Sequence, residues 1–158
     1  MELLQPGLQH GLHPGPHQAP AVQRTVAFFA GLTAADLARL HEIYTPDARF
    51  KDPFNEVTGV PAITAVFAHM FNTLDAPRFV IHDTVVQGAQ CFLTWDFVFH
   101  MRRFVRREQR IRGGSHLLLA ADGRIGVHRD YWDVAEELYE KLPLLGGLMR
   151  WLKRRVAS

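Results

Sequence analysis

The sequence predicts an α+β domain in which helices cover one face of a curved antiparallel sheet. Two observations lead to this fold class. Residues 22–74 carry apolar side chains at the spacing of amphipathic helices, whereas residues 79–132 alternate as strands do. Helices followed by a series of antiparallel strands are typical of α+β folds.

The chain divides into three segments. Residues 1–20 are rich in Pro and Gly, which predicts a disordered leader. Residues 21–142 carry the patterns of a folded domain, and residues 143–158 those of a basic amphipathic helix. A chain of 158 residues is long enough for one domain with a buried core.

Three helices are expected in the first half of the domain. Val22 and Phe29 share the spacing of the first helix. Residues 33–36 resemble a capping box and begin the second helix, which Pro46 ends. Pro61 suits the first turn of the third helix, which carries an apolar stripe on one face.

Strands and turns follow in a regular order. A short strand over residues 48–51 precedes a polar turn that Gly59 closes. The longer strands are predicted over residues 79–87, 91–104, 111–121 and 124–132, with a turn over 106–109 and a helix over 133–142. Asp122-Gly123 predicts a hairpin turn, and Gly113-Gly114 predicts a bulge or the close approach of a ligand.

Composition limits the possible partners. The net charge of +2 is weak, so no nucleic-acid partner is expected. The single cysteine, Cys91, rules out a disulfide within the chain and predicts the cytoplasm. No apolar stretch reaches the ~18 residues of a membrane span, and the basic terminal helix is expected on the domain or a partner rather than on a membrane surface. The histidines lack a spaced cluster with carboxylates, so neither a metal nor another cofactor is predicted.

The long strand over residues 91–104 has two unlike sides. The apolar side holds Leu93, Trp95, Phe97, Phe99 and Met101, and the mixed side holds Phe92, Thr94, Asp96, Val98 and His100. The apolar side could lie under the helices, leaving Asp96 and Asp130 in water. Alternatively the mixed side lines a cavity and a second copy of the protein covers the apolar side. Alternation alone supports both arrangements.

Two stretches resemble the nuclear transport factor 2-like superfamily, which includes ketosteroid isomerase, limonene epoxide hydrolase and the SnoaL-like polyketide cyclases. They are "YTPDARFKDPFNEVTG" before an apolar helix and "DGRIGVHRDYWD" on the last strand. The likeness covers about residues 22–142. It implies a cone-shaped curved antiparallel sheet wrapped around N-terminal helices, a cystatin-like roll. Tyr131-Trp132 matches an aromatic pair on the last strand of the isomerase, which implies that Trp132, Asp130 and His128 lie inside the cone. The resemblance then implies that the mixed side lines the cavity and that the apolar side forms a homodimer.

The isomerase pattern implies a general base at Asp52, the aspartate before proline. The oxyanion donors of that pattern are absent, because Phe28 and Ser115 stand in their places and Phe67 replaces a supporting tyrosine. One lost donor of this kind typically costs ~10²–10³ in rate. Steroid isomerisation is therefore not expected.

The epoxide hydrolase pattern offers a second correspondence. It implies that Asp96 and Asp130 occupy two acidic positions, while Thr94 replaces an arginine. Phe50 and Asp52 would replace a water-orienting tyrosine and asparagine. Cyclase-type relatives use a single acid on an activated substrate, which demands less of the remaining donors.

The resulting hypothesis is a cavity that binds a small, mostly apolar organic molecule and moves protons without a cofactor. The candidate catalytic residues are Asp52, Asp96 and Asp130. The candidate lining residues are Phe28, Tyr44, Phe50, Phe67, Thr94, Ser115, His128 and Trp132. The alternatives are a non-catalytic ligand-binding module and a dimerisation module of the same fold.

Each candidate acid also has a structural interpretation. Asp52 could cap the turn over residues 53–58 by accepting hydrogen bonds from backbone amides. Asp96 could pair with Arg112 on the neighbouring strand. Asp130 could pair with His128 or Arg129.

Overall fold

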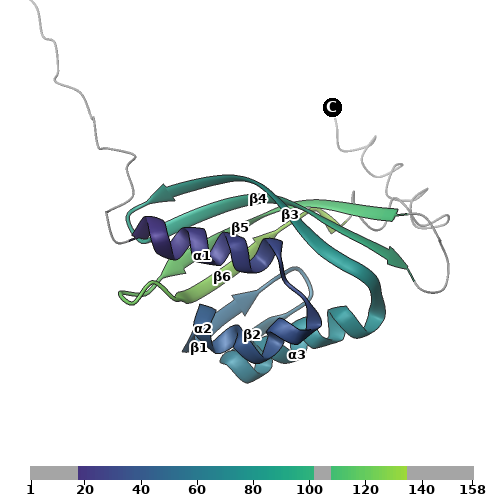
Figure 1. Ribbon diagram of the computed structural model, residues 1–158, viewed down its shortest axis with the longest axis horizontal. Helices are drawn as coiled ribbons and strands as arrows, with labels where there is room; N and C mark the ends of the chain where they lie inside the picture. Colours follow the sequence, from purple (N-terminus) through teal and green to yellow (C-terminus); the bar gives the residue numbers. More distant parts are fainter. Residues whose placement is uncertain (1–17, 102–107, 135–158) are drawn as a thin grey trace, which may run out of the picture.

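The computed structural model describes residues 18–101 and 108–134 (Figure 1). Its helical elements are α1 (Gln18–Ala30), the 3-10 helix η1 (Ala34–Arg39), α2 (Leu40–Ile43) and α3 (Val60–Thr73). Its strands are β1 (Tyr44–Lys51), β2 (Glu56–Thr58), β3 (Leu74–Gln87), β4 (Gln90–Met101), β5 (Glu108–Leu119) and β6 (Ile125–Tyr131).

The strands form one open sheet of six strands in the order β2-β1-β6-β5-β4-β3. The predicted α+β class is confirmed, but the sheet is mixed because β1 and β6 pair in parallel. The remaining neighbours are antiparallel. A parallel pair needs a long connection, and here most of the domain lies between the two strands.

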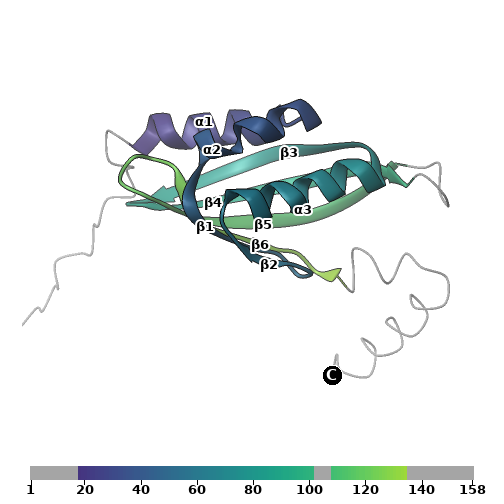
Figure 2. The same cartoon turned by 90° about the horizontal axis from the view of Figure 1, so that it is seen from below.

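The helices cover one face of the sheet. Figure 2 shows α1 and α3 on the same side of the curved strands. Phe29 on α1 and Ile63 and Phe67 on α3 belong to the same buried core as Tyr44 and Ile125 of the sheet. Burial of each large apolar side chain contributes roughly 1.5–3 kcal/mol. None of the described helices is long and apolar enough to cross a membrane.

Some element boundaries differ from the predicted ones. The first helix begins at Gln18, inside the predicted leader. Pro46 lies within β1 instead of ending a helix, at the point where the β1–β6 register is irregular between Tyr44 and Arg49. A residue without an N–H group is tolerated at such an irregularity. β3 follows α3 directly, so it begins at Leu74 rather than at residue 79.

Several local signals are confirmed. The Asp36 carboxylate accepts hydrogen bonds from the Thr33 N–H and hydroxyl, as half of the predicted capping box. Pro61 lies in the first turn of α3. Gly123 has a φ of +82° in the hairpin turn predicted at Asp122-Gly123. The predicted turn over residues 106–109 and the helices over 133–142 and 143–158 lie largely outside the described residues.

Candidate functional site

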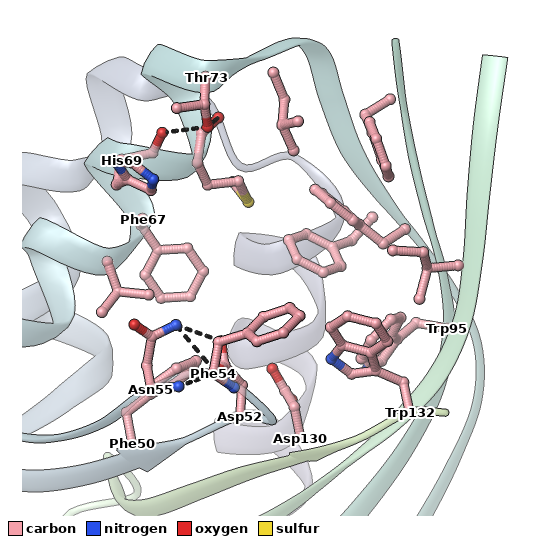
Figure 3. Close-up of a pocket in the computed structure, with 17 residues that line it drawn as sticks. Phe50, Asp52, Phe54, Asn55, Phe67, His69, Thr73, Trp95, Asp130 and Trp132 are labelled. Atoms are coloured by element: carbon pink, nitrogen blue, oxygen red, sulfur yellow. Dashed lines mark hydrogen bonds between the residues drawn. The ribbon is translucent and has the colours of Figure 1, made fainter. Parts of the chain in front are cut away.

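A cavity of about 310 Å³ lies between α3 and the inner face of the sheet (Figure 3). Its aromatic walls are Phe50, Phe54, Phe67, Phe79, Trp95, Phe97, Phe99 and Trp132. Its polar lining residues are Asp52, Asn55, His69, Thr73 and Asp130. A volume of this size and a mainly apolar wall are typical of small-molecule sites.

The apolar side of β4 faces this cavity. Trp95, Phe97 and Phe99 line it, whereas the mixed side of the strand faces away from the helices. The expectation that the mixed side of β4 lines the cavity, with the apolar side as a dimer surface, was therefore wrong. The helices and β3 bury the apolar side, which removes the need for a second copy to cover it.

Gly113 makes room for one wall of the cavity. A Cβ atom at this position would lie 2.3 Å from the Trp95 ring, which packs over the glycine on the neighbouring strand. The register of β4 and β5 is continuous through Gly113 and Gly114, so the predicted bulge is absent there. Glycine is needed at position 113 because an aromatic side chain of the protein itself approaches the backbone closely.

The Asp130 carboxylate on β6 is held by a network of buried side chains. Its Oδ1 accepts hydrogen bonds from the Ser115 hydroxyl and from His128 Nε2, the latter at 2.8 Å. The Ser115 oxygen in turn accepts the Trp95 indole N–H at 2.8 Å. Within the described part of the chain no hydrogen bond reaches Oδ2 of Asp130, whose side chain is 14% exposed and lines the cavity. One oxygen is thus held in place while the other is available to a ligand.

The protonation of this network follows from Tyr44. The Tyr44 hydroxyl lies 2.6 Å from His128 Nδ1. Burial, together with the negative charge of Asp130, raises the pKa of Tyr44 well above its usual range. Tyr44 therefore keeps its proton, and its hydroxyl donates a hydrogen bond to Nδ1 of His128. The N–H of the imidazole then lies on Nε2, toward Asp130. The hydroxyl of Tyr44 thus donates to His128, and His128 donates to the carboxylate of Asp130.

Asp52 closes the turn after β1. Its Oδ1 accepts hydrogen bonds from the backbone N–H groups of Phe54, at 2.7 Å, and of Asn55. The Asn55 side chain donates to both carboxylate oxygens at 3.0 Å. The capping interpretation of Asp52 is thus confirmed, and the same side chain lines the cavity. Its role as a base stays a prediction.

The two acids lie beside each other at one end of the cavity. The parallel register pairs Lys51 with Arg129, so the next position on each strand brings Asp52 next to Asp130. Figure 3 shows both side chains together at the edge where β1 and β6 end. A second, open groove of about 570 Å³ at this edge is also lined by both acids, with Lys51 and Arg129. The acids therefore separate an apolar cavity from a polar surface groove.

Asp96 lies on the opposite, outer face of the sheet. Its Oδ2 is 2.6 Å from Arg110 and 3.2 Å from His82. Although burial opposes ionisation, the hydrogen bonds from these two side chains hold the pKa of Asp96 below its usual value. The prediction that Asp96 shares the cavity was wrong. Arg112 lies directly opposite Asp96 in the register, but the ion pair is formed by Arg110, two positions away on the same face of β5.

The predicted lining residues fall into three groups. Phe50, Phe67 and Trp132 line the cavity. Tyr44, Ser115 and His128 form the buried network behind Asp130. Thr94 is bonded to Asp83 on the outer face, and Phe28 lines a separate surface groove beside α1, so both were placed wrongly.

Other lining residues escaped the sequence analysis. They are mainly Phe79 on β3, the aromatic side chains of β4, and Val66 and Met70 on α3. The uninterrupted apolar side of β4 and the apolar stripe of α3 carried the signal for most of them.

Metal-binding clusters and reactive thiols do not feature in this site. Residues 18–101 and 108–134 contain no group of three or more His, Cys, Asp or Glu side chains placed to hold a metal ion. Burial raises the pKa of the Cys91 thiol to about 11, which makes it a poor nucleophile near neutral pH.

Comparison with known sequences assigns the chain to one protein family. A sequence model of the SnoaL-like domain family matches residues 25–128. A comparison with curated protein sequences gives no significant match.

Solved structures share the fold at low sequence identity. A protein assigned as a SnoaL-like polyketide cyclase from Jannaschia sp. CCS1 is 19% identical with a TM-score of 0.67, over 78% of this chain and 92% of that chain. A limonene epoxide hydrolase-like epoxide hydrolase from Mycobacterium tuberculosis is 19% identical with a TM-score of 0.65, over 90% and 100%. A protein with a ketosteroid isomerase-like fold from Catenulispora acidiphila, in complex with trimethylamine, is 16% identical with a TM-score of 0.63, over 75% of this chain and 88% of that chain.

Proposed function

The chain belongs to the SnoaL-like domain family, and from this premise we propose that it binds a small, mostly apolar organic molecule and exchanges a proton with it through Asp130. The observation that carries the proposal is the Asp130 carboxylate, with Oδ1 held by two donors and Oδ2 open to an aromatic cavity. A fixed carboxylate beside a bound carbon acid or hydroxyl has the geometry of a general base.

The surrounding residues have positioning roles in this proposal. Ser115 and His128 hold Oδ1, and Tyr44 fixes the tautomer of His128. Asp52 lies beside Asp130 and could accept a second proton or orient a polar group of the ligand. No cofactor takes part in the proposed reaction.

The residues that differ from the isomerase pattern limit the substrates that the site could deprotonate. The Ser115 hydroxyl is committed to Asp130, and Phe67 contributes only an apolar ring to the cavity wall. An oxyanion would find little support from these side chains. We therefore propose a substrate that is already activated toward proton loss, rather than a simple ketone.

Deuterium exchange tests the proposal across a panel of activated carbon acids. Nitroalkanes and other carbon acids that are un-ionised at neutral pH are incubated with the full chain in D₂O and followed by mass spectrometry. Exchange of at least one compound should be faster than in buffer, and Asp130→Asn should slow it by ~10²-fold or more. The control is Asp47→Asn, an exposed acid on β1 outside the cavity.

Two results would change the assignment. Exchange by Asp130→Asn at the wild-type rate would remove Asp130 from the reaction. Binding of apolar compounds without exchange of any of them would favour the second candidate, a non-catalytic ligand-binding module. The strongly apolar cavity wall is the observation that favours this candidate.

We also propose a cytoplasmic homodimer, now through the outer face of the sheet. Val80, Val85, Phe92 and Tyr131 are exposed large hydrophobic side chains on that face. Light scattering during size-exclusion chromatography should give twice the chain mass of 18.0 kDa, and Phe92→Glu should shift it to the monomer. The single buried thiol of Cys91 suits a reducing compartment.

A further inference from the structure

We propose that the ligand of the cavity carries a positive charge, as an ammonium or iminium group, and that this group lies at the end formed by Asp52 and Asp130. The inference rests on the proposed function, because it names the chemical class of the molecule that the cavity would bind.

The cavity is lined by acidic side chains without a matching Lys or Arg. Figure 3 draws 17 lining residues, of which two are Asp and none is Lys or Arg; His69 on α3 is the remaining titratable side chain. Charges in an apolar enclosure act more strongly than in water. The acidic end of the cavity therefore attracts a ligand that is cationic when it binds and repels a carboxylate.

The aromatic side chains at the same end add to this preference. The rings of Phe54 and Trp132 meet edge to face, with their centroids 5.4 Å apart. Both line the cavity with the two acids, and Phe54 is 58% exposed although it is large and apolar. Aromatic faces bind alkylammonium groups, and the two carboxylates beside these rings add an opposite charge. An apolar body with a cationic head would satisfy both the walls and the acidic end.

The nearest basic side chains are engaged elsewhere. Lys51 and Arg129 share the open surface groove with the two acids, but neither basic side chain lines the cavity. Lys51 forms an ion pair with Glu56, and the Arg129 guanidinium lies 5.0 Å from the centre of the Tyr131 ring. These contacts leave the negative charge at the cavity end available to a ligand.

Three compounds of similar shape and different charge test the inference. Phenyltrimethylammonium, tert-butylbenzene and benzenesulfonate each join a phenyl ring to a tetrahedral group, with charges of +1, 0 and −1. Their dissociation constants for the full chain are measured by calorimetry and by tryptophan fluorescence, because Trp95 and Trp132 line the cavity. The cation should bind about tenfold or more tightly than the neutral compound, and the anion most weakly.

Variants locate the preference at the proposed end. Asp130→Asn should reduce the difference between cation and neutral compound by several-fold, whereas Asp47→Asn should leave it unchanged. Phe54→Leu offers a test that does not depend on the buried network, because Phe54 is exposed and remains apolar as leucine. It should weaken binding of the cation and leave tert-butylbenzene nearly unaffected.

The outcomes separate this inference from the proposed function. Binding of tert-butylbenzene as tightly as the cation would overturn the cationic ligand and leave the apolar cavity function intact. A cation preference that survives in both Asp130→Asn and Phe54→Leu would overturn the assigned location. Failure of all three compounds to bind at millimolar concentration would overturn the proposed function as well.

Discussion

Replacing Tyr44 by Phe removes a single oxygen atom from a fully buried position and tests the network behind the cavity. The hydroxyl lies 2.6 Å from His128 Nδ1. The ring itself is retained, so its packing against Phe29, with centroids 6.3 Å apart, and its stacking on His128, at 5.9 Å, should persist. The variant therefore isolates the hydrogen bond from the apolar contacts.

The expected loss of stability is roughly 1–3 kcal/mol, because a buried acceptor is left without a donor. Tyr44 is 0% exposed and His128 is 5% exposed, so water has little access to replace the lost proton donor. His128 is also freed from the constraint that places its N–H on Nε2. A population with the proton on Nδ1 would turn a lone pair toward Asp130 and weaken its support.

Urea unfolding, followed by tryptophan fluorescence, measures the free energy of unfolding at neutral pH. Imidazole ¹⁵N shifts report the tautomer of His128 in the same samples. Tyr131→Phe serves as the matched control, since Tyr131 is 50% exposed and should change stability by less than ~0.5 kcal/mol. A loss below ~0.5 kcal/mol in Tyr44→Phe, with unchanged ¹⁵N shifts, would refute donation from Tyr44 to His128.

Further predictions concern packing and pH. Gly113→Ala should displace the Trp95 ring, lower stability by ~1–3 kcal/mol in thermal unfolding and alter the tryptophan emission, since the new Cβ would lie 2.3 Å from that ring. The raised pKa of Cys91, about 11 against an ordinary 9.0, stabilises the fold below about pH 9. Wild type should therefore lose up to about 3 kcal/mol relative to Cys91→Ser as the pH rises from 9 to 11, which urea titrations at each pH would show. The pKa of Asp96 is lowered by its partner Arg110, so Asp96→Asn should be less stable than wild type at pH 7, and the gap should close as the pH falls below 3.8; a constant gap would contradict the ion pair.

Much of the fold was predictable because its signals are local. Pro61 at a helix start, Asp122-Gly123 at a hairpin and the polar turn around Asp52 all depend on neighbouring residues. The inward placement of His128 and Asp130 followed from the family resemblance, and the structure brings both to the cavity side of β6.

The orientation of β4 was not predictable from its own sequence. One side of the strand is wholly apolar and the other mixes apolar with polar residues, and this alternation alone left both orientations toward the helices open. The buried position of Asp96 became acceptable only through Arg110 and His82, which other strands supply. The resemblance correctly placed the mixed side of the last strand toward the cavity. The same orientation was then assumed for β4, whose apolar side faces the cavity instead.

The parallel pairing of β1 with β6 has a consequence for how the site is assembled. The strands from β3 to β6 are sequential neighbours, so their pairing closes short loops, whereas the Tyr44–His128 contact joins residues 84 positions apart. Closing a longer loop costs more chain entropy, and contacts of high sequence separation slow folding. Asp52 and Asp130 are brought together by this distant pairing. A chain whose central strands are already paired would thus have the aromatic wall of β4 without the acidic end of the cavity, and ligand binding would begin only when the first strand docks against the last.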